Sequence, residues 1–137
     1  MSNESDIRHG RRCVFKLHVH LVFVAKYRHR VFDARAIDVL RSIFADVCSE
    51  LQSTLVEMDG EDDHVQLRVE YPPKLAISSL VNSLKGVSSR LLRQQRPDIR
   101  KRYWKGVLRS PSYFASSCGG APISIVRQYI EQQKTPN

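Results

Sequence analysis

Several features that would narrow the function at once are scarce or missing in this sequence. The 137 residues include only three cysteines, an odd number without a CxxC spacing, so no disulfide framework is indicated. We expect Cys13, Cys48 and Cys118 to be reduced thiols of a cytoplasmic protein. No apolar run approaches the roughly 18 residues of a membrane span, and the polar start is not that of a signal peptide. We therefore expect no membrane partner.

Basic charge is what the chain has in excess. Lysine and arginine number 22 against 14 acidic residues, which gives a formal net charge of +8. This balance favours a polyanionic partner, and nucleic acid before a membrane surface, because no long amphipathic basic helix stands out. The length and the hydrophobic fraction of 42% indicate one globular domain. We expect a flexible tail over residues 1–12 and a single domain over residues 13–137.

The first half of the chain alternates between strand-like and helix-like spacing. Residues 13–25, CVFKLHVHLVFVA, have apolar residues at every second position, as in a long strand. Asp33 is suited to cap a helix whose apolar residues recur at helical spacing over 37–51. STLVEMD and HVQLRVEY then predict a hairpin through the acidic turn at Gly60.

The second half adds a helix, a strand and a final helix. Apolar residues at helical spacing over 77–91 predict the second helix, and residues 93–112 are interpreted as an irregular basic stretch. SYFASSC is a short fourth strand. The first six elements have the order of an α+β, ferredoxin-like (RRM-like) fold, an antiparallel sheet with helices on one face. A C-terminal helix follows a predicted hinge at 119–121.

Two similar stretches are candidates for a metal site. In HVHL, His18 and His20 lie in the middle of a strand with no third ligand nearby in sequence, so a metal site there is poorly supported. In HVQL, His64 and Gln66 share one strand face just after an acidic turn. An imidazole nitrogen and an amide oxygen can both bind a divalent cation, and the oxygen suits Mg²⁺ or Mn²⁺. Such a pair alone is more often ordinary strand surface than a site.

The last helix carries a second pair of polar side chains. Tyr129 and Gln133 are four residues apart and therefore share one helical face, next to the apolar stripe. A tyrosine in that position could simply pack against the sheet. Together with His64 and Gln66, however, these residues make a complete set for metal-assisted phosphoryl transfer, in which a phenolate attacks phosphorus.

Several stretches in the same order give the chain a specific family resemblance. From about Val14 to Gln133 it resembles the HUH-type single-tyrosine transposases of the insertion sequence 200 and 605 group, through LHVHLVFVAKYRHRVF, DHVQLRVEYPPK, LVNSLKGVSSR, YWKGVLRSPSYF and QYIEQQ. The resemblance implies that Tyr129 is the nucleophile and that His64, Gln66 and Gln133 bind Mg²⁺ or Mn²⁺. It implies no ligand in HVHL. Gln66 stands where histidine is usual, as in the HUQ variants of these enzymes.

The same resemblance implies a substrate and an assembly. The expected activity is DNA transposition, in which subterminal hairpins are bound and single-stranded DNA is cleaved and rejoined through a 5′-phosphotyrosine. The expected assembly is a homodimer with composite active sites, in which the last helix of one subunit can complete the His64/Gln66 site of the other. Cleavage and rejoining of this kind need no ATP.

Basic residues crowd the loop after the first strand and the second helix with the segment that follows it. Cations can hold phosphates while interleaved aromatic rings stack on unpaired bases. Scattered charge is usually solvated surface, and Trp104 could equally belong to the core. The candidate DNA-binding residues are Lys26, Arg28, Arg30, Lys85, Arg90, Arg93, Arg100, Lys101, Arg102, Trp104 and Lys105.

Two alternatives remain open at the level of sequence. A non-catalytic ferredoxin-like module that binds nucleic acid would explain the charge and the aromatic residues, but not the pairing of Tyr129 with Gln133. A domesticated HUH nuclease that cleaves DNA without mobilising an element would share every residue discussed above. Only the DNA that flanks the gene would separate it from a transposase.

Overall fold

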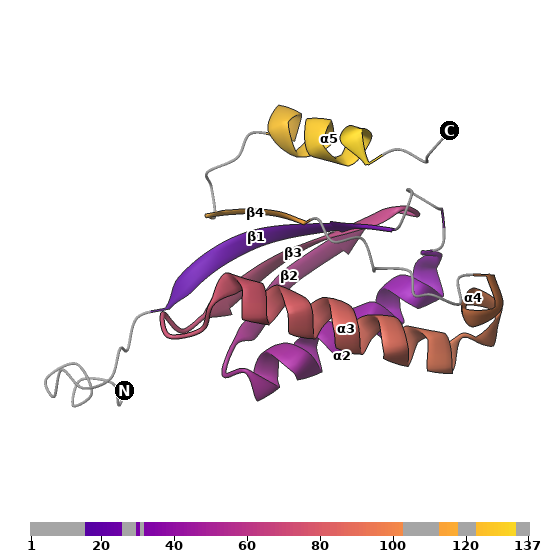
Figure 1. Ribbon diagram of the computed structural model, residues 1–137, viewed down its shortest axis with the longest axis horizontal. Coiled ribbons are helices and arrows are strands. Elements are labelled where there is room, and N and C mark those ends of the chain that lie inside the picture. Colours follow the sequence, from indigo (N-terminus) through magenta and orange to yellow (C-terminus); the bar gives the residue numbers. More distant parts are fainter. Residues whose placement is uncertain (1–15, 26–29, 31, 103–112, 118–122, 134–137) are drawn as a thin grey trace, which may run out of the picture.

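The computed structural model describes residues 16–25, 30, 32–102, 113–117 and 123–133 (Figure 1). The predicted tail, the predicted hinge and the cysteines Cys13 and Cys118 lie outside these ranges. The elements are β1 (Leu17–Val24), α2 (Ala34–Glu50), β2 (Thr54–Gly60), β3 (His64–Tyr71), α3 (Ile77–Gln95), α4 (Pro97–Arg102), β4 (Phe114–Ser117) and α5 (Ile123–Gln132). Their order confirms the predicted one, with α4 as an addition.

The four strands form one antiparallel sheet in the order β2-β3-β1-β4. The first strand is thus central, between β3 and the short edge strand β4. Helices α2 and α3 cover one face of the sheet, and α5 lies across the other (Figure 1). The α+β, ferredoxin-like prediction is confirmed, with the last helix placed on the face that α2 and α3 leave uncovered.

The main core lies between the sheet and the two long helices. Alternate residues of β1, Val19, Leu21 and Phe23, are buried there, and the Phe23 ring meets Phe44 of α2 edge to face at 6.0 Å. Each fully buried side chain of this kind contributes about 1.5–3 kcal/mol to folding relative to exposure. Because successive side chains of a strand point to opposite faces, the histidines of β1 are turned away from this core.

A smaller apolar cluster holds α5 on the other face. It consists of Val22 and Val24 of β1 with Val126 and Ile130 of α5. The apolar stripe predicted for the last helix is confirmed at these two helical positions, while the Ile123 side chain lies outside the described residues. Among the described residues, four buried side chains make this contact, with Phe114 and Tyr129 packed against them, so the cluster is much smaller than the one under α2 and α3.

The interpretation of residues 93–112 as irregular is wrong at its start. Helix α3 continues to Gln95, and α4 follows over Pro97–Arg102. Pro97 explains the interruption, because proline disfavours the helical conformation of the residue before it and suits the first turn of a new helix. Asp98 in that first turn adds a favourable charge at the helix N-terminus.

An ion-pair cluster ties the start of α2 to the end of α3. Asp33 caps α2 as predicted, accepting a hydrogen bond of 2.8 Å from the backbone N–H of Ala36. The Arg96 guanidinium donates to both oxygens of Asp33 at 2.8 Å, and it also pairs with Asp98. These hydrogen bonds, that from Arg96 above all, hold the pKa of Asp33 at about 2.

Two further sequence expectations are tested by the described residues. Cys48 is a free thiol, fully buried on α2, and its burial raises its pKa to about 11. Among the helices of the described ranges, none has both the length and the apolar content that crossing a bilayer would require.

Candidate functional site

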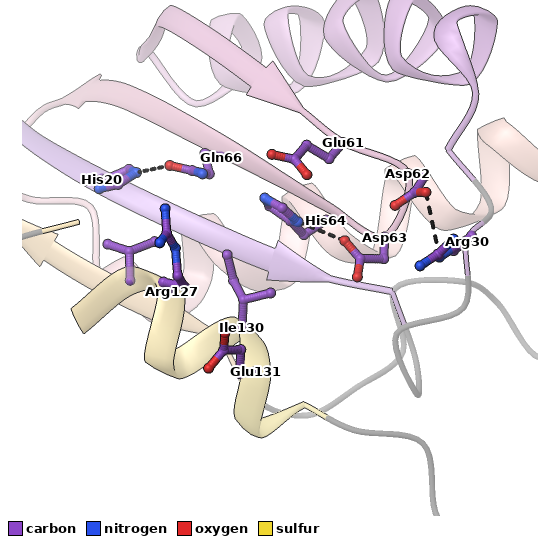
Figure 2. A pocket seen from close by; sticks show the side chains of 11 residues that line it. His20, Arg30, Glu61, Asp62, Asp63, His64, Gln66, Arg127, Ile130 and Glu131 are labelled. Carbon is purple, nitrogen blue, oxygen red and sulfur yellow. Dashed lines mark hydrogen bonds and ion pairs between the residues drawn. The ribbon is translucent and has the colours of Figure 1, made fainter. Parts of the chain in front are cut away.

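The two competing stretches, HVHL and DHVQL, lie side by side in the folded chain. Strands β1 and β3 are antiparallel neighbours, with Val22 opposite Gln66 and Val24 opposite His64. The alternation of side chains puts His20, His64 and Gln66 on the face opposite the main core. Figure 2 shows these three side chains beside one another, with Asp62 and Asp63 of the acidic turn to their right. From the sequence alone the two stretches are alternative metal sites, whereas in the structure they are parts of one surface.

A pocket of about 610 Å³ opens on this surface. Its floor is formed by the His20, His64 and Gln66 side chains, and the acidic turn supplies Glu61, Asp62 and Asp63. Helix α5 lies along the opposite side (Figure 2). The pocket therefore brings together residues from the first strand, the hairpin and the last helix.

His64 is held in one orientation by the residue before it. Its Nδ1 atom lies 2.8 Å from a carboxylate oxygen of Asp63, and both side chains are less than a tenth exposed. A carboxylate only accepts hydrogen bonds, so Nδ1 carries a proton, and in the neutral imidazole this leaves the lone pair on Nε2. Backbone bonds from Ala25 to Asp63 and from Phe32 to Asp62 fix the turn in place.

Gln66 is held from the neighbouring strand. Its Oε1 atom lies 3.2 Å from Nε2 of His20, across the boundary between β1 and β3. Both side chains are half-buried. This contact was not predicted from the sequence, although the two-residue period of both strands was a signal that could have suggested it.

Tyr129 and Gln133 do not line this pocket. The α5 residues that do are Val126, Arg127, Ile130 and Glu131 (Figure 2). The Tyr129 ring instead packs against Phe114 of β4, with ring centroids 5.5 Å apart and planes tilted by 46°. Within one chain the structure brings His64 and Gln66 together in the pocket, whereas neither Tyr129 nor Gln133 is part of its lining.

A metal site in this pocket would depend on an amide oxygen. Within the described ranges, no three side chains of histidine, cysteine, aspartate or glutamate gather in a way that could hold a metal ion. The predicted set of His64, Gln66 and Gln133 has one imidazole and two amides, so only His64 belongs to those four residue types. The two amide oxygens of this set are of the kind that Mg²⁺ and Mn²⁺ prefer as ligands.

The candidate DNA-binding residues fall on two sides of the molecule. Arg30 borders the pocket and lies 3.6 Å from Asp62. Arg90 is exposed on α3, in the helical layer beyond the sheet, and Arg93 on the same helix is half-buried and donates to the Ser89 carbonyl. Lys85 of α3 is half-buried with its ammonium 6.0 Å from the Phe23 ring centre, and burial lowers its pKa.

The remaining candidates cannot be placed as side chains. Lys26, Arg28, Trp104 and Lys105 lie outside the described residues. For Arg100, Lys101 and Arg102 only the helical backbone of α4 is described. Their role in binding DNA stays a prediction.

Comparisons with known proteins agree on one family. Residues 13–133 match the family described as "Transposase IS200 like". The ISDra2 transposase TnpA of Deinococcus radiodurans is 31% identical over 128 residues, which cover 93% of this chain and 91% of that protein. A crystal structure of a transposase from the same organism superposes with a TM-score of 0.83 at 32% identity, covering 93% of this chain and 98% of that one.

A more distant structure shares the fold. It is a REP-associated tyrosine transposase bound to a REP hairpin, with a TM-score of 0.54 at 12% identity, covering 88% of this chain and 67% of that one.

Proposed function

This chain belongs to the family of IS200-like transposases, enzymes that cleave DNA and transfer the cut strands, and we propose that it acts on single-stranded DNA through Tyr129. The observation that carries the proposal is the fixed orientation of the His64 and Gln66 side chains in the pocket. His64 and Gln66 lie on one face of β3, each held by a specific neighbour, where a phosphodiester could approach from solvent.

The residues present fit a divalent cation. Asp63 fixes the tautomer of His64 so that Nε2 keeps its lone pair, and Gln66 contributes an amide oxygen. We propose that these two atoms and the Gln133 side chain hold Mg²⁺ or Mn²⁺. When bound, such an ion supplies Lewis-acid polarisation of the scissile phosphate. A carboxylate that orients a histidine from behind is the usual support for this kind of ligand.

Tyr129 supplies the nucleophile in the proposed reaction. Its phenolate oxygen forms a bond to phosphorus while the bond from phosphorus to the 3′ oxygen breaks. The products are a 5′-phosphotyrosine and a free 3′-OH. Attack by another 3′-OH on the phosphotyrosine reverses these steps and joins two strands. One phosphate ester replaces another at each stage, so no ATP is consumed.

The place of Tyr129 supports a composite site. The tyrosine lies on a part of α5 that does not border the pocket of its own chain, where it packs on Phe114. We propose a homodimer in which α5 of one subunit presents Tyr129 and Gln133 to the His64/Gln66 pair of the other. The small apolar cluster that holds α5 is consistent with a helix that can be exchanged.

The proposed DNA partner is a strand that carries subterminal hairpins. The net charge of +8 suits a polyanion, and a protein of the same fold is bound to a REP hairpin. Among the candidate residues whose side chains are described, Arg30 at the pocket rim and Arg90 on α3 have the exposure that such contacts need.

The decisive experiment looks for covalent attachment. The protein is incubated with single-stranded element ends and Mg²⁺, and a protein–DNA band that survives denaturation is expected. Tyr129→Phe keeps the ring that packs on Phe114 but lacks the hydroxyl, so it should bind hairpins and form no band. Undiminished cleavage by this variant would remove Tyr129 from the mechanism. A wild-type protein that binds DNA and never cleaves it would favour the non-catalytic module.

A mixing experiment tests the composite site. Tyr129→Phe and His64→Ala subunits are each expected to be inactive alone. In a mixed dimer with composite sites, one site contains an intact His64 from the first subunit and an intact Tyr129 from the second, so cleavage returns. If each chain completes its own site, every site in the mixture carries one defect and no cleavage returns.

A further inference from the structure

We propose that His20 is a positioning residue of the His64/Gln66 site, whose imidazole N–H fixes the direction in which the Gln66 amide oxygen points. This role rests on the proposed function, because Gln66 matters only if its oxygen binds a metal ion. It assigns a purpose to the HVHL stretch, for which the family resemblance implied no ligand.

The two ends of an amide side chain are not equivalent. Gln66 has one end that can bind a cation, the oxygen, and one end that only donates hydrogen bonds. A half-turn about the last bond of the side chain exchanges the two ends. A histidine at this position would have no such problem, since either ring nitrogen can carry the lone pair. A glutamine ligand therefore needs a partner that selects one orientation.

His20 is placed to make that selection. Its Nε2 atom lies 3.2 Å from Oε1 of Gln66, within hydrogen-bonding distance. The carbonyl oxygen of an amide cannot donate, so the imidazole is the donor and its proton sits on Nε2. An amide oxygen has two lone pairs, and the bond from His20 uses one of them. The other is left for a cation.

The two sheet strands make this support rigid. His20 lies on β1 and Gln66 on β3, diagonal neighbours across the antiparallel ladder in which Val22 faces Gln66. The residues flanking His20, Val19 and Leu21, are buried in the main core. The imidazole is thus attached to a central strand whose flanking side chains are packed in the core. His20 and His64 are both in the pocket lining, so His20 lies beside the proposed ligands (Figure 2).

The chain offers a matched control two residues away. His18 projects from the same face of β1, but its imidazole pairs with Glu70 at 3.2 Å and is 44% exposed. It is not part of the pocket lining. Substitutions at His18 therefore test what the loss of a histidine from this strand does by itself.

Three full-length variants separate the possibilities. His20→Phe keeps a flat ring and lacks the N–H, whereas His20→Gln places an amide nitrogen near the position of Nε2. His18→Phe is the control. The first readout needs no metal: the ¹⁵N–¹H signals of the Gln66 side-chain amide, assigned with Gln66→Asn. We expect them to move in His20→Phe, to stay near their wild-type positions in His20→Gln, and to be unchanged in His18→Phe.

The second readout is binding of Mn²⁺ alone, followed by the loss of the free-ion EPR signal. We expect affinity about tenfold weaker in His20→Phe, at the lower end of what removing a support of a metal ligand costs. His20→Gln should recover most of that loss. A Gln66 signal that stays unmoved in His20→Phe, or Mn²⁺ affinity equal to that of His18→Phe, would overturn the proposal. Melting temperatures show whether any change is merely structural.

A double substitution tests whether His20 acts through Gln66. In a Gln66→Ala background, adding His20→Phe should weaken Mn²⁺ binding no further, because the group being positioned is gone. Additive losses would instead make His20 an independent ligand and contradict the positioning role. These results are distinct from a failure of the proposed function. If Tyr129→Phe still cleaved DNA, the coupling between His20 and Gln66 would stand without the tyrosine chemistry.

Discussion

The carboxylate of Asp63 and the imidazole of His64 are joined by a hydrogen bond of 2.8 Å, although the two residues are adjacent in the chain and both are nearly fully buried. The backbone of Asp63 is also held in place, because its carbonyl oxygen accepts a hydrogen bond from the N–H of Ala25, the residue after β1. One turn of the hairpin therefore both closes the β2–β3 connection and sets the tautomer of the only histidine that β3 contributes.

Removing that carboxylate should weaken the metal site without removing a ligand. We expect Asp63→Ala to reduce Mn²⁺ affinity by about 10–100-fold, the usual cost of losing such a support, and Asp63→Asn to cost less because its amide oxygen still accepts from Nδ1. The exposed Asp46 of α2 provides a control of equal charge change, as Asp46→Asn. Equal affinities for Asp63→Ala and Asp46→Asn would mean that His64 needs no orienting partner.

Replacing Gln66 tests the unusual amide ligand directly. A neutral oxygen binds these ions less tightly than an imidazole nitrogen binds Mn²⁺, so Gln66→His should tighten Mn²⁺ binding and keep or raise cleavage. Gln66→Ala should lose most activity. Cleavage is measured against the concentration of Mg²⁺ and of Mn²⁺ for all three proteins. An alanine variant that titrates like the wild type would show that Gln66 is not a ligand.

Low pH should remove the contribution of the Asp33–Arg96 ion pair to the stability of the fold. The pKa of Asp33 is depressed to about 2 from an ordinary 3.8, so its ion pair with Arg96 stabilises the fold above the ordinary value and is lost as the pH falls toward 2. Asp33→Ala also removes the helix cap and should cost about 1 kcal/mol at neutral pH. Asp33→Asn keeps a cap and should cost less, because the carboxylate is more than half exposed and its ion pair is screened.

Urea unfolding of these two variants and the wild type between pH 2 and 7 checks that prediction. The advantage of the wild type over Asp33→Asn should shrink steadily as the pH falls below about 4. A constant difference across the whole range would assign the effect of the substitution to something other than the carboxylate charge.

Hairpin binding should depend steeply on salt, because cations displace counterions from phosphates. Arg90→Glu should weaken binding at low salt for all sequences alike and reduce the salt slope by about one. Reversal of Arg100, Lys101 and Arg102 together should have a larger effect of the same kind. Lys74→Glu, an equal charge change at an exposed site outside the candidate set, is the control in a fluorescence-anisotropy titration. Salt-insensitive binding would point to a different surface.

The fold could be predicted where local spacing alone decides it. Alternation in β1 and β3 and the helical stripes of α2, α3 and α5 depend only on which face each residue must bury. The short helix α4 was missed because its six residues are too few for a period and include four that are charged. Pro97 was the available signal, and it was outweighed by the surrounding basic residues.

The candidate site was predictable only in pieces. His64 and Gln66 could be paired from the sequence because residues two apart on a strand share a face. The contact between His20 and Gln66 depends on the register of two strands that are separated by a helix and another strand, and that register is set by packing of the whole sheet. The role of Tyr129 came from the family resemblance and stays a prediction, since the structure places it against Phe114.

The division of β1 between two faces limits how this strand can change over time. Single substitutions affect one face only, so an exposed position such as His18 is open to variation while the buried Val19 is not. Insertion or deletion of one residue within Leu17–Val24 is a different event, because it would turn every later side chain to the opposite face. Phe23 would then leave the core in the same step that took His20 or Gln66 out of register. Related transposases should therefore vary at the exposed positions of this strand and remain constant in its length.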